Sequence, residues 1–195
     1  MSVHITDLQI DTTDIDGLLV CTLKQITDER GTVREFFRAS SFTSNYGASF
    51  GGGSGPDWKQ INVTESGYGA IRGMHGEAMV KLVSCVAGRA FGGYLDARPE
   101  SASYGKVVTV ELAPGTQVLV PAGVCNGFQS TSESGSQYLY CFTEEWRPGM
   151  AGTAFSPLDD GLGISWPVSI DPTDPSRISV KDATAAKFSE LAGNG

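Results

Sequence analysis

The sequence has little histidine, few cations and no long apolar run, and each shortage excludes a class of protein. No apolar stretch of its 195 residues approaches the length of about 20 that a membrane-spanning helix needs. The 14 basic residues are outnumbered by 22 acidic ones, which gives a formal net charge of -8. That charge argues against non-specific nucleic-acid binding, which needs a cationic surface to neutralise phosphates. A small anionic ligand stays compatible with it, since Arg30, Arg34, Arg72 and Lys81 lie among the apolar segments.

Targeting and disulfide signals are also missing. Asp7 and Asp11 come early, where a secretion signal would have a basic region followed by an apolar one. The cysteines, at positions 21, 85, 125 and 141, lie inside or beside apolar segments and form no C-x-x-C pair. We therefore expect a cytoplasmic protein with four buried thiols, without a disulfide framework and without a zinc site.

Strand signals dominate what is present. Short segments rich in Val, Leu, Tyr and Phe alternate with turn residues, which is typical of a sandwich, jelly roll or closed barrel. The predicted strands are 17–25, 32–38, 58–64, 68–72, 80–86, 89–95, 105–112, 116–120, 137–143 and 163–168. Ala87-Gly88 suits a two-residue hairpin turn, and Pro114-Gly115 turns the chain before 116–120.

Helix signals are confined to the C-terminus. Ser179-Val180-Lys181-Asp182 has the composition of a helix cap, and helix-forming residues follow over 183–191. Residues 43–56, which contain Gly51-Gly52-Gly53, predict a loop over the mouth of a site. This glycine tract lacks the strand–helix context of a phosphate-cradling loop.

Of the two histidines, only His75 falls in an apparent strand, within Ile71-Arg72-Gly73-Met74-His75-Gly76. His4 lies near the N-terminus, where chains commonly fray. An imidazole titrates near neutral pH, so it can take a proton and later return it. A structural core histidine remains the alternative, because a single histidine names no reaction.

The order of several short motifs resembles the dTDP-4-dehydrorhamnose 3,5-epimerase family of cupin-like enzymes, from about Gly17 to Leu191. The motifs are Asp28-Glu29-Arg30-Gly31 with Glu35, Gln60-Ile61-Asn62, Arg72-Gly73-Met74-His75, Lys81-Leu82-Val83, Tyr104-Gly105-Lys106, Val120-Pro121-Ala122-Gly123, Asn126-Gly127-Phe128, Tyr138-Leu139-Tyr140, Gly163-Ile164-Ser165-Trp166-Pro167 and Ser179-Val180-Lys181-Asp182. The resemblance implies an all-β, antiparallel jelly-roll barrel with a short C-terminal helix, in a single domain over 1–195. It also implies a homodimer formed through sheet edges near the N-terminus.

The resemblance further implies a cofactor-independent epimerase of a nucleotide-linked 4-keto-6-deoxysugar, with dTDP as the expected nucleotide. Inverting a carbon beside a ketone removes a proton from one face and returns one to the other, so it needs two proton carriers. By resemblance, His75 is the base, Asp182 orients its ring, and Tyr140 is the acid on the opposite face. Lys81 stabilises the enolate oxygen, so no metal is required. Without the resemblance, Tyr140 reads as core, Asp182 as a helix-start carboxylate and Lys81 as a solvated side chain.

Binding residues follow from the same resemblance. Arg30 and Arg72 match positions that contact the diphosphate or orient the sugar, and the guanidinium fork suits phosphate. Trp146 stands where the family commonly has a tyrosine that stacks on the base; a buried structural tryptophan is the alternative. The polar positions on the nucleotide side are Glu35, Gln60 and Asn62.

The sequence departs from the family pattern in three places: at both members of a second histidine–aspartate pair and in one loop. Asn126, which we keep among the substrate-binding residues, replaces a histidine, and Gly92 replaces the aspartate that pairs with it. The loop between His75 and Lys81 is also short. We therefore expect proton abstraction to be retained and positioning at one carbon to be changed, which suits a mono-epimerase or an enzyme that acts on a different deoxysugar. A repurposed homologue that binds a sugar nucleotide without epimerising it is the alternative. A metal-dependent cupin is disfavoured, because such proteins present several histidines.

Overall fold

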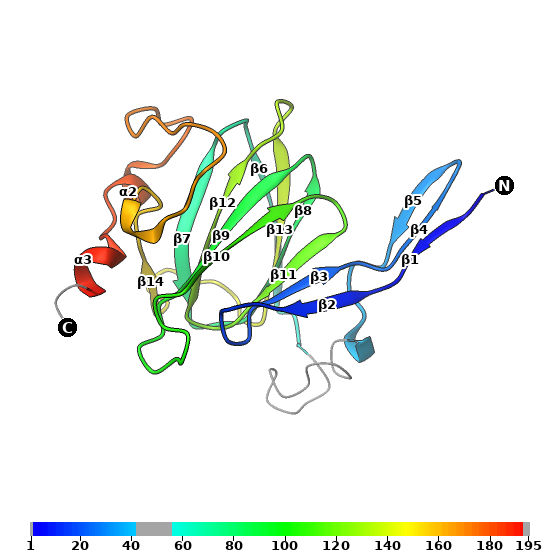
Figure 1. Cartoon of the computed structure of the whole chain (residues 1–195), viewed down its shortest axis with the longest axis horizontal. Helices are drawn as coiled ribbons and strands as arrows, with labels where there is room; N and C mark the ends of the chain where they lie inside the picture. Colours follow the sequence, from blue (N-terminus) through cyan, green and yellow to red (C-terminus); the bar gives the residue numbers. More distant parts are fainter. Residues whose placement is uncertain (1, 42–55, 193–195) are drawn as a thin grey trace.

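The computed structural model describes residues 2–41 and 56–192, so most of the loop predicted at 43–56 lies outside the described residues. Among the described residues, no helix has the length and apolar character needed to cross a membrane. Two antiparallel sheets form a jelly-roll barrel (Figure 1). The fold class predicted above is thereby confirmed.

The five-stranded sheet has the order β10-β9-β12-β7-β14 and the six-stranded sheet the order β2-β3-β11-β8-β13-β6. The strands of the first are β7 (Ile71–Glu77), β9 (Ala90–Asp96), β10 (Val107–Leu112), β12 (Val124–Ser130) and β14 (Gly152–Ala154). Those of the second are β2 (Gln9–Thr12), β3 (Leu19–Thr22), β6 (Gln60–Ser66), β8 (Lys81–Ala87), β11 (Thr116–Val120) and β13 (Ser136–Phe142).

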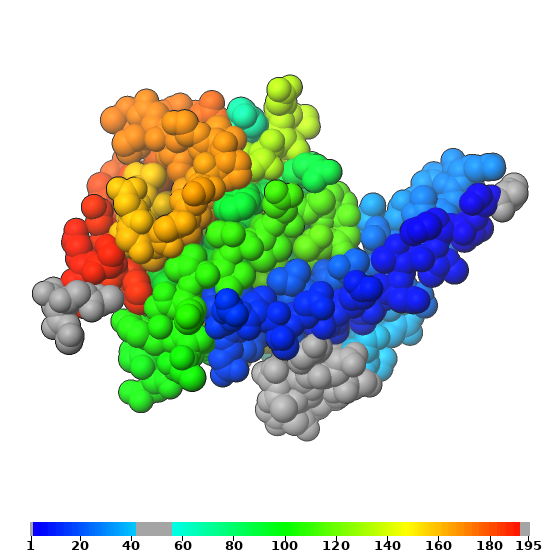
Figure 2. All heavy atoms as spheres, in the orientation of Figure 1, coloured from blue at the N-terminus to red at the C-terminus, as the bar shows by residue number. Residues whose placement is uncertain are grey.

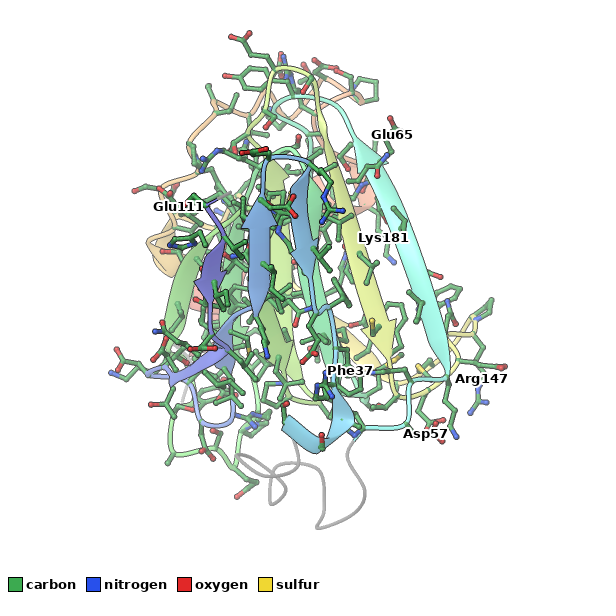
Figure 3. All side chains as sticks on the ribbon, turned by 90° about the vertical axis from the view of Figure 1, so that its right-hand side faces the viewer. Phe37, Asp57, Glu65, Glu111, Arg147 and Lys181 are labelled. Atoms are coloured by element: carbon green, nitrogen blue, oxygen red, sulfur yellow. The ribbon has the colours of Figure 1, made fainter. Side chains whose placement is uncertain are left out.

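The six-stranded sheet is buried on both faces at its central strands β8 and β11, whereas its edge strands β2 and β6 are largely exposed. Because side chains alternate along a strand, Val83 and Cys85 of β8 face the core between the sheets, while Leu82 faces the other way. The outward cluster around Leu82 is covered by Phe36, Phe37 and Trp58, and Figure 3 shows Phe37 at the foot of this face. All four cysteines are buried and free, which confirms the prediction of buried thiols.

A third, three-stranded sheet forms an arm that projects from the barrel (Figures 1 and 2). Its strands are β1 (His4–Thr6), β4 (Gln25–Asp28) and β5 (Gly31–Arg34), so His4 lies in a paired strand rather than in a frayed end. Ile5 pairs with Ile26, and Ile26 with Val33. These three side chains form an apolar row that is 58%, 43% and 74% exposed, respectively.

The C-terminal segment begins as predicted, because the hydroxyl of Ser179 accepts a hydrogen bond from the backbone N–H of Asp182 at 3.0 Å. The helical region over 180–191 is, however, two short helices, α2 (Val180–Ala183) and α3 (Phe188–Ala192). The backbone carbonyl of Ala186 accepts from Ser156, and the Phe188 ring packs on Phe155 at 5.3 Å. These tertiary contacts override the helix propensity of the intervening residues.

Two sequence predictions about strands are wrong. Segment 163–168 is a loop; its Trp166 packs over β9, where a side chain on Gly93 would lie 3.0 Å from the indole. Ala87-Gly88 does not close a hairpin, because β8 and β9 belong to different sheets and the turn carries the chain from one to the other. The other predicted strands coincide with or overlap observed ones, whereas β1, β2, β12 and β14 have no predicted counterpart. A short helical turn, η2 (Asp160–Leu162), follows β14.

Candidate active site

A cavity of about 480 Å³ opens into the barrel between the two sheets, beside α2. Its walls come from β6, β7, β12 and β13 and from the segment that leads into α2. Most of the predicted site residues line it. They are Asn62, Arg72, His75, Lys81, Asn126, Tyr140, Trp146 and Asp182.

His75 and Asp182 form a hydrogen bond across 107 positions of sequence, with 2.8 Å between His75 Nε2 and Asp182 Oδ1. This contact was predicted and is confirmed. A carboxylate only accepts, so the proton of the neutral ring is on Nε2 and the lone pair on Nδ1. Burial raises the pKa of the Asp182 carboxyl, but the hydrogen bonds from His75 and Ser179 lower this pKa by more than burial raises it. The net pKa is therefore below its usual value. The pair is therefore an oriented imidazole with an ionised partner.

Tyr140 lies on the opposite wall of the cavity, because β13 belongs to the six-stranded sheet and the β7 strand of His75 to the other. Its ring packs between Tyr138, at 4.9 Å, and Phe142, at 5.6 Å. Burial raises the pKa of its phenol well above the usual value, more than the positive charge of Arg72 lowers it. The phenol is thus protonated at neutral pH and able to donate.

Lys81 is buried, with a side chain only 2% exposed, so it is not the solvated side chain that the sequence alone allows. Its ammonium lies 2.5 Å from Glu77 Oε2, 2.5 Å from Asn126 Oδ1 and 3.1 Å from the His75 carbonyl oxygen. Glu77, which also lines the cavity, was not identified from the sequence. Its signal is alternation, because His75 and Glu77 are two apart on one strand and share a face.

Cations gather at the mouth of the cavity although the chain as a whole is acidic. Arg72, Arg177 and Lys181 line it, and neither Arg177 nor Lys181 was singled out from the sequence. Arg72 Nε donates to the Ser66 hydroxyl at 3.1 Å, which leaves the rest of its guanidinium available. Such a rim suits a doubly charged diphosphate.

The polar residues at the other side of the mouth are linked in a chain. Gln60 does not line the cavity, but its amide donates to Asn62 Oδ1 at 3.1 Å and its carbonyl accepts from the Trp146 backbone at 2.7 Å. Trp146 is 53% exposed, which rules out the buried structural tryptophan. Its indole is free to stack on a planar ring.

Arg30 and Glu35 do not line the cavity of their own chain. Arg30 lies at the β4–β5 turn of the arm, bonded to Asp28, and Glu35 is bonded to Arg38. Arg30 is therefore at the outer end of the arm, whereas Glu35 directly follows β5 at the end of the arm next to the barrel, where its backbone N–H donates to the Lys24 carbonyl at 3.0 Å. Their assignment to substrate binding stays a prediction.

The positions where the sequence departs from the family pattern lie together. Asn126 is the cross-strand partner of His75 on one side and of Tyr94 on the other. A side chain on Gly92 would start 2.8 Å from the Tyr94 hydroxyl, so this buried tyrosine fills the space of the absent carboxylate. Residues 78–80 alone join β7 to β8, which gives the short loop.

These observations define a cupin-like jelly-roll protein with an oriented imidazole, a facing phenol and a cationic rim in one cavity. Residues 12–190 match the family described as dTDP-4-dehydrorhamnose 3,5-epimerase. The chain therefore belongs to the dTDP-4-dehydrorhamnose 3,5-epimerase family, an isomerase family, as the resemblance of its motifs predicted.

Individual relatives agree with this placement. The chain is 32% identical over 179 residues to a dTDP-4-dehydrorhamnose 3,5-epimerase of Salmonella typhimurium, covering 89% of this chain and 91% of that protein. It is 31% identical over 154 residues to a dTDP-4-dehydro-6-deoxyglucose 3-epimerase of Streptomyces bikiniensis, covering 75% and 74%. A crystal structure of the Legionella pneumophila 3,5-epimerase in complex with dTDP-4-keto-L-rhamnose superposes with a TM-score of 0.81, at 28% identity and 96% coverage of both chains.

Proposed function

We propose that this chain is a cofactor-independent, cytoplasmic epimerase of a dTDP-linked 4-keto-6-deoxysugar, acting in deoxysugar biosynthesis. The observation that carries the proposal is the His75–Asp182 pair facing Tyr140 across one cavity. Two proton carriers on opposite walls are what inversion of a carbon requires. The names of the relatives support the substrate, since they act on dTDP-4-dehydro sugars.

The reaction is a proton transfer in two steps. His75 Nδ1 takes the hydrogen of the carbon beside the ketone, and the electron pair of the broken C–H bond moves onto the ketone oxygen as an enolate. Tyr140 then gives its phenolic proton to the opposite face of that carbon, and solvent reprotonates the phenolate and deprotonates the imidazolium. Asp182 stabilises the imidazolium in between. Each carrier is expected to contribute roughly 10²–10⁴-fold.

The same cavity offers a place for each part of the substrate. We assign the diphosphate to Arg72, Arg177 and Lys181 at the mouth, where charge-assisted hydrogen bonds can form. We assign the nucleoside to the opposite rim, with Asn62 as a polar contact and the exposed Trp146 as the stacking surface. The sugar then reaches inward between His75 and Tyr140.

We further propose that inversion is confined largely to one of the two carbons beside the ketone. One base can serve both only if the ring shifts between two productive poses, and a misplacement of about 1 Å is enough to disable one of them. Asn126, Gly92 and the three-residue loop remove family contacts from one side of the site. A relative that is a 3-epimerase supports this restriction.

The experiment is turnover of dTDP-4-keto-6-deoxyglucose in deuterium oxide, followed by NMR at both carbons beside the ketone. The proposal expects deuterium mainly at one carbon, with unchanged turnover after dialysis against a chelator. Comparable rates at both carbons would contradict the restriction and indicate a 3,5-epimerase. Deuterium at neither carbon would contradict the activity and favour the repurposed binding protein.

We propose that the chain is a homodimer that pairs through the arm. The exposed apolar row of Ile5, Ile26 and Val33 supports this, because open sheet edges with apolar faces readily pair. Pairing through the arm also gives Arg30 and Glu35, which lie outside their own cavity, a route to the cavity of a second copy.

A further inference from the structure

Asn126 is the cross-strand partner of His75, the proposed base, in the wall of the cavity. In the β7–β12 pairing it lies directly opposite His75, so both side chains emerge on the same face with their Cβ atoms about 4.5–5.5 Å apart. Asn126 is 5% exposed and lines the cavity. Its carboxamide therefore lies beside the imidazole in the wall of the cavity.

The ammonium of Lys81 fixes which way this carboxamide points. An ammonium only donates, so the Asn126 atom 2.5 Å from it is the carbonyl oxygen and the Nδ2 amide points the other way. The three hydrogens of Lys81 are matched by three protein acceptors, Asn126 Oδ1, Glu77 Oε2 and the His75 carbonyl. Lys81 therefore has no hydrogen left for a ketone oxygen unless one of these bonds breaks.

The Nδ2 amide, in contrast, is available. Among the described residues none accepts a hydrogen bond from it, and the residue faces the cavity. The bond from the ammonium to the carbonyl oxygen polarises the amide, which makes its N–H groups better donors. Glu77, in turn, holds the ammonium in place and offsets its charge.

We infer that Asn126 Nδ2, in place of the Lys81 ammonium to which the resemblance assigned this role, is the hydrogen-bond donor to the ketone oxygen as the enolate forms, and that Lys81 and Glu77 are positioning residues that orient the amide. The inference rests on the proposed function and assigns the oxyanion contact within it. It also accounts for the two replacements together. An amide oriented by Lys81 needs no carboxylate at position 92, and the Tyr94 side chain takes that space.

The test compares three variants at position 126 by deuterium exchange into dTDP-4-keto-6-deoxyglucose. Asn126→Asp keeps an oxygen toward Lys81 but has no N–H, so kcat falls about 10²–10³-fold, as for loss of an oxyanion donor. Asn126→Leu removes both the donor and the acceptor, so its kcat falls at least as far. Asn126→His returns a neutral N–H donor and recovers most of the rate. The affinity for dTDP stays within about twofold in all three, because the contact forms in the transition state.

Glu77 is tested as a positioning residue by the split between kcat and KM. Glu77→Gln keeps an acceptor for Lys81 but removes the charge, so kcat falls about tenfold while KM and the unfolding midpoint stay unchanged. Glu111→Gln on β10 is the matched control, since Glu111 does not line the cavity. Figure 3 shows Glu111 on the opposite side of the view from Lys181, which does line it.

Two results would overturn the inference alone. One is wild-type exchange by Asn126→Asp, which would make Asn126 only an acceptor for Lys81. The other is an Asn126→His variant as slow as Asn126→Asp, which would assign the loss to charge or shape. Absence of exchange by the wild-type enzyme would instead contradict the proposed function, and the inference with it.

Discussion

The barrel and the arm each contain an Asp-x-Arg turn built from the same hydrogen bonds in opposite surroundings. In the arm, Arg30 donates to Asp28 from its backbone and its guanidinium; in the barrel, Arg98 does the same to Asp96. Asp96 is fully buried and also accepts from two serine hydroxyls, whereas the Arg30 side chain is 90% exposed. The same set of hydrogen bonds is thus buried in the barrel, where it stabilises the fold, and exposed to solvent in the arm.

The same contrast holds for the predicted site residues. Most of those on barrel strands and on α2 meet in one cavity, because the fold brings distant segments such as β7 and α2 together. Arg30, at the outer turn of the arm, and Glu35, directly after β5, lie outside this cavity. A motif can therefore identify a residue correctly while leaving open whether its own chain completes the site.

The largest effect expected inside the barrel is the separation of exchange from inversion by Tyr140→Phe. Without the phenol, His75 can still remove a hydrogen and return a deuteron to the same face. Inversion should fall roughly 10²–10⁴-fold, the contribution of one proton carrier, while exchange with retention falls much less. NMR in deuterium oxide reports both quantities on one sample. Inversion at the wild-type rate would show that another group delivers the second proton.

A smaller effect, on the free energy of unfolding, is expected when the two Asp-x-Arg turns are compared by substitution. Burial raises the pKa of the Asp96 carboxyl, but its bonds to Arg98, Ser101 and Ser103 lower it by more, well below the usual value. The carboxylate therefore stabilises the fold above the ordinary carboxyl pKa, and this stability is lost as pH falls toward the lower folded value. Asp96→Asn should reduce the free energy of unfolding by about 3 kcal/mol, the cost of breaking a buried ion pair.

Urea unfolding at about pH 7 and about pH 3 measures both parts of this prediction, because the interval spans the ordinary carboxyl pKa. The difference between wild type and Asp96→Asn should shrink at the lower pH. Asp28→Asn on the arm is the matched control and should leave the midpoint unchanged, since exposed pairs contribute little. Equal losses from the two substitutions would contradict the contrast between the regions.

The smallest effect on the stability of the barrel is expected from the arm, where the readout is the oligomeric state. Val33→Lys places a charge in the apolar row and should convert the proposed dimer to monomer with the barrel still folded. Leu191→Lys, at an exposed apolar position of α3, is the control. Sedimentation velocity at micromolar concentration distinguishes the two. A Val33→Lys variant that stays dimeric would exclude the arm as the interface, and a monomeric wild type would remove the dimer.

Periodicity predicted the barrel, but some elements escaped it for physical reasons. β12 has no predicted counterpart because Asn126 and Gly127 read as turn residues, although the whole strand is buried between β7 and β9. Segment 163–168 has strand composition, yet its Trp166 packs over β9 in the space that a side chain at Gly93 would otherwise fill. Tertiary packing decided both cases.

For the site, motifs identified His75, Asp182, Tyr140 and Lys81, and the cavity contains all four. Glu77 was missed because no motif contains it and its partner Lys81 comes from another strand. Arg177 was missed for a similar reason, since a lone arginine carries no pattern. Alternation places Glu77 on the face of His75, but its contact with Lys81 and the place of Arg177 at the cavity both depend on contacts between segments, which sequence spacing does not supply.

The most direct test of the central claim, that His75 begins the reaction by removing a proton, uses the two histidines of the chain. His75→Ala and His4→Ala are compared for deuterium incorporation beside the ketone and for dTDP binding. We predict that His75→Ala loses exchange by roughly 10²–10⁴-fold while binding dTDP normally, that Asp182→Asn loses less, and that His4→Ala behaves as wild type. Exchange by His75→Ala at the wild-type rate would contradict the account.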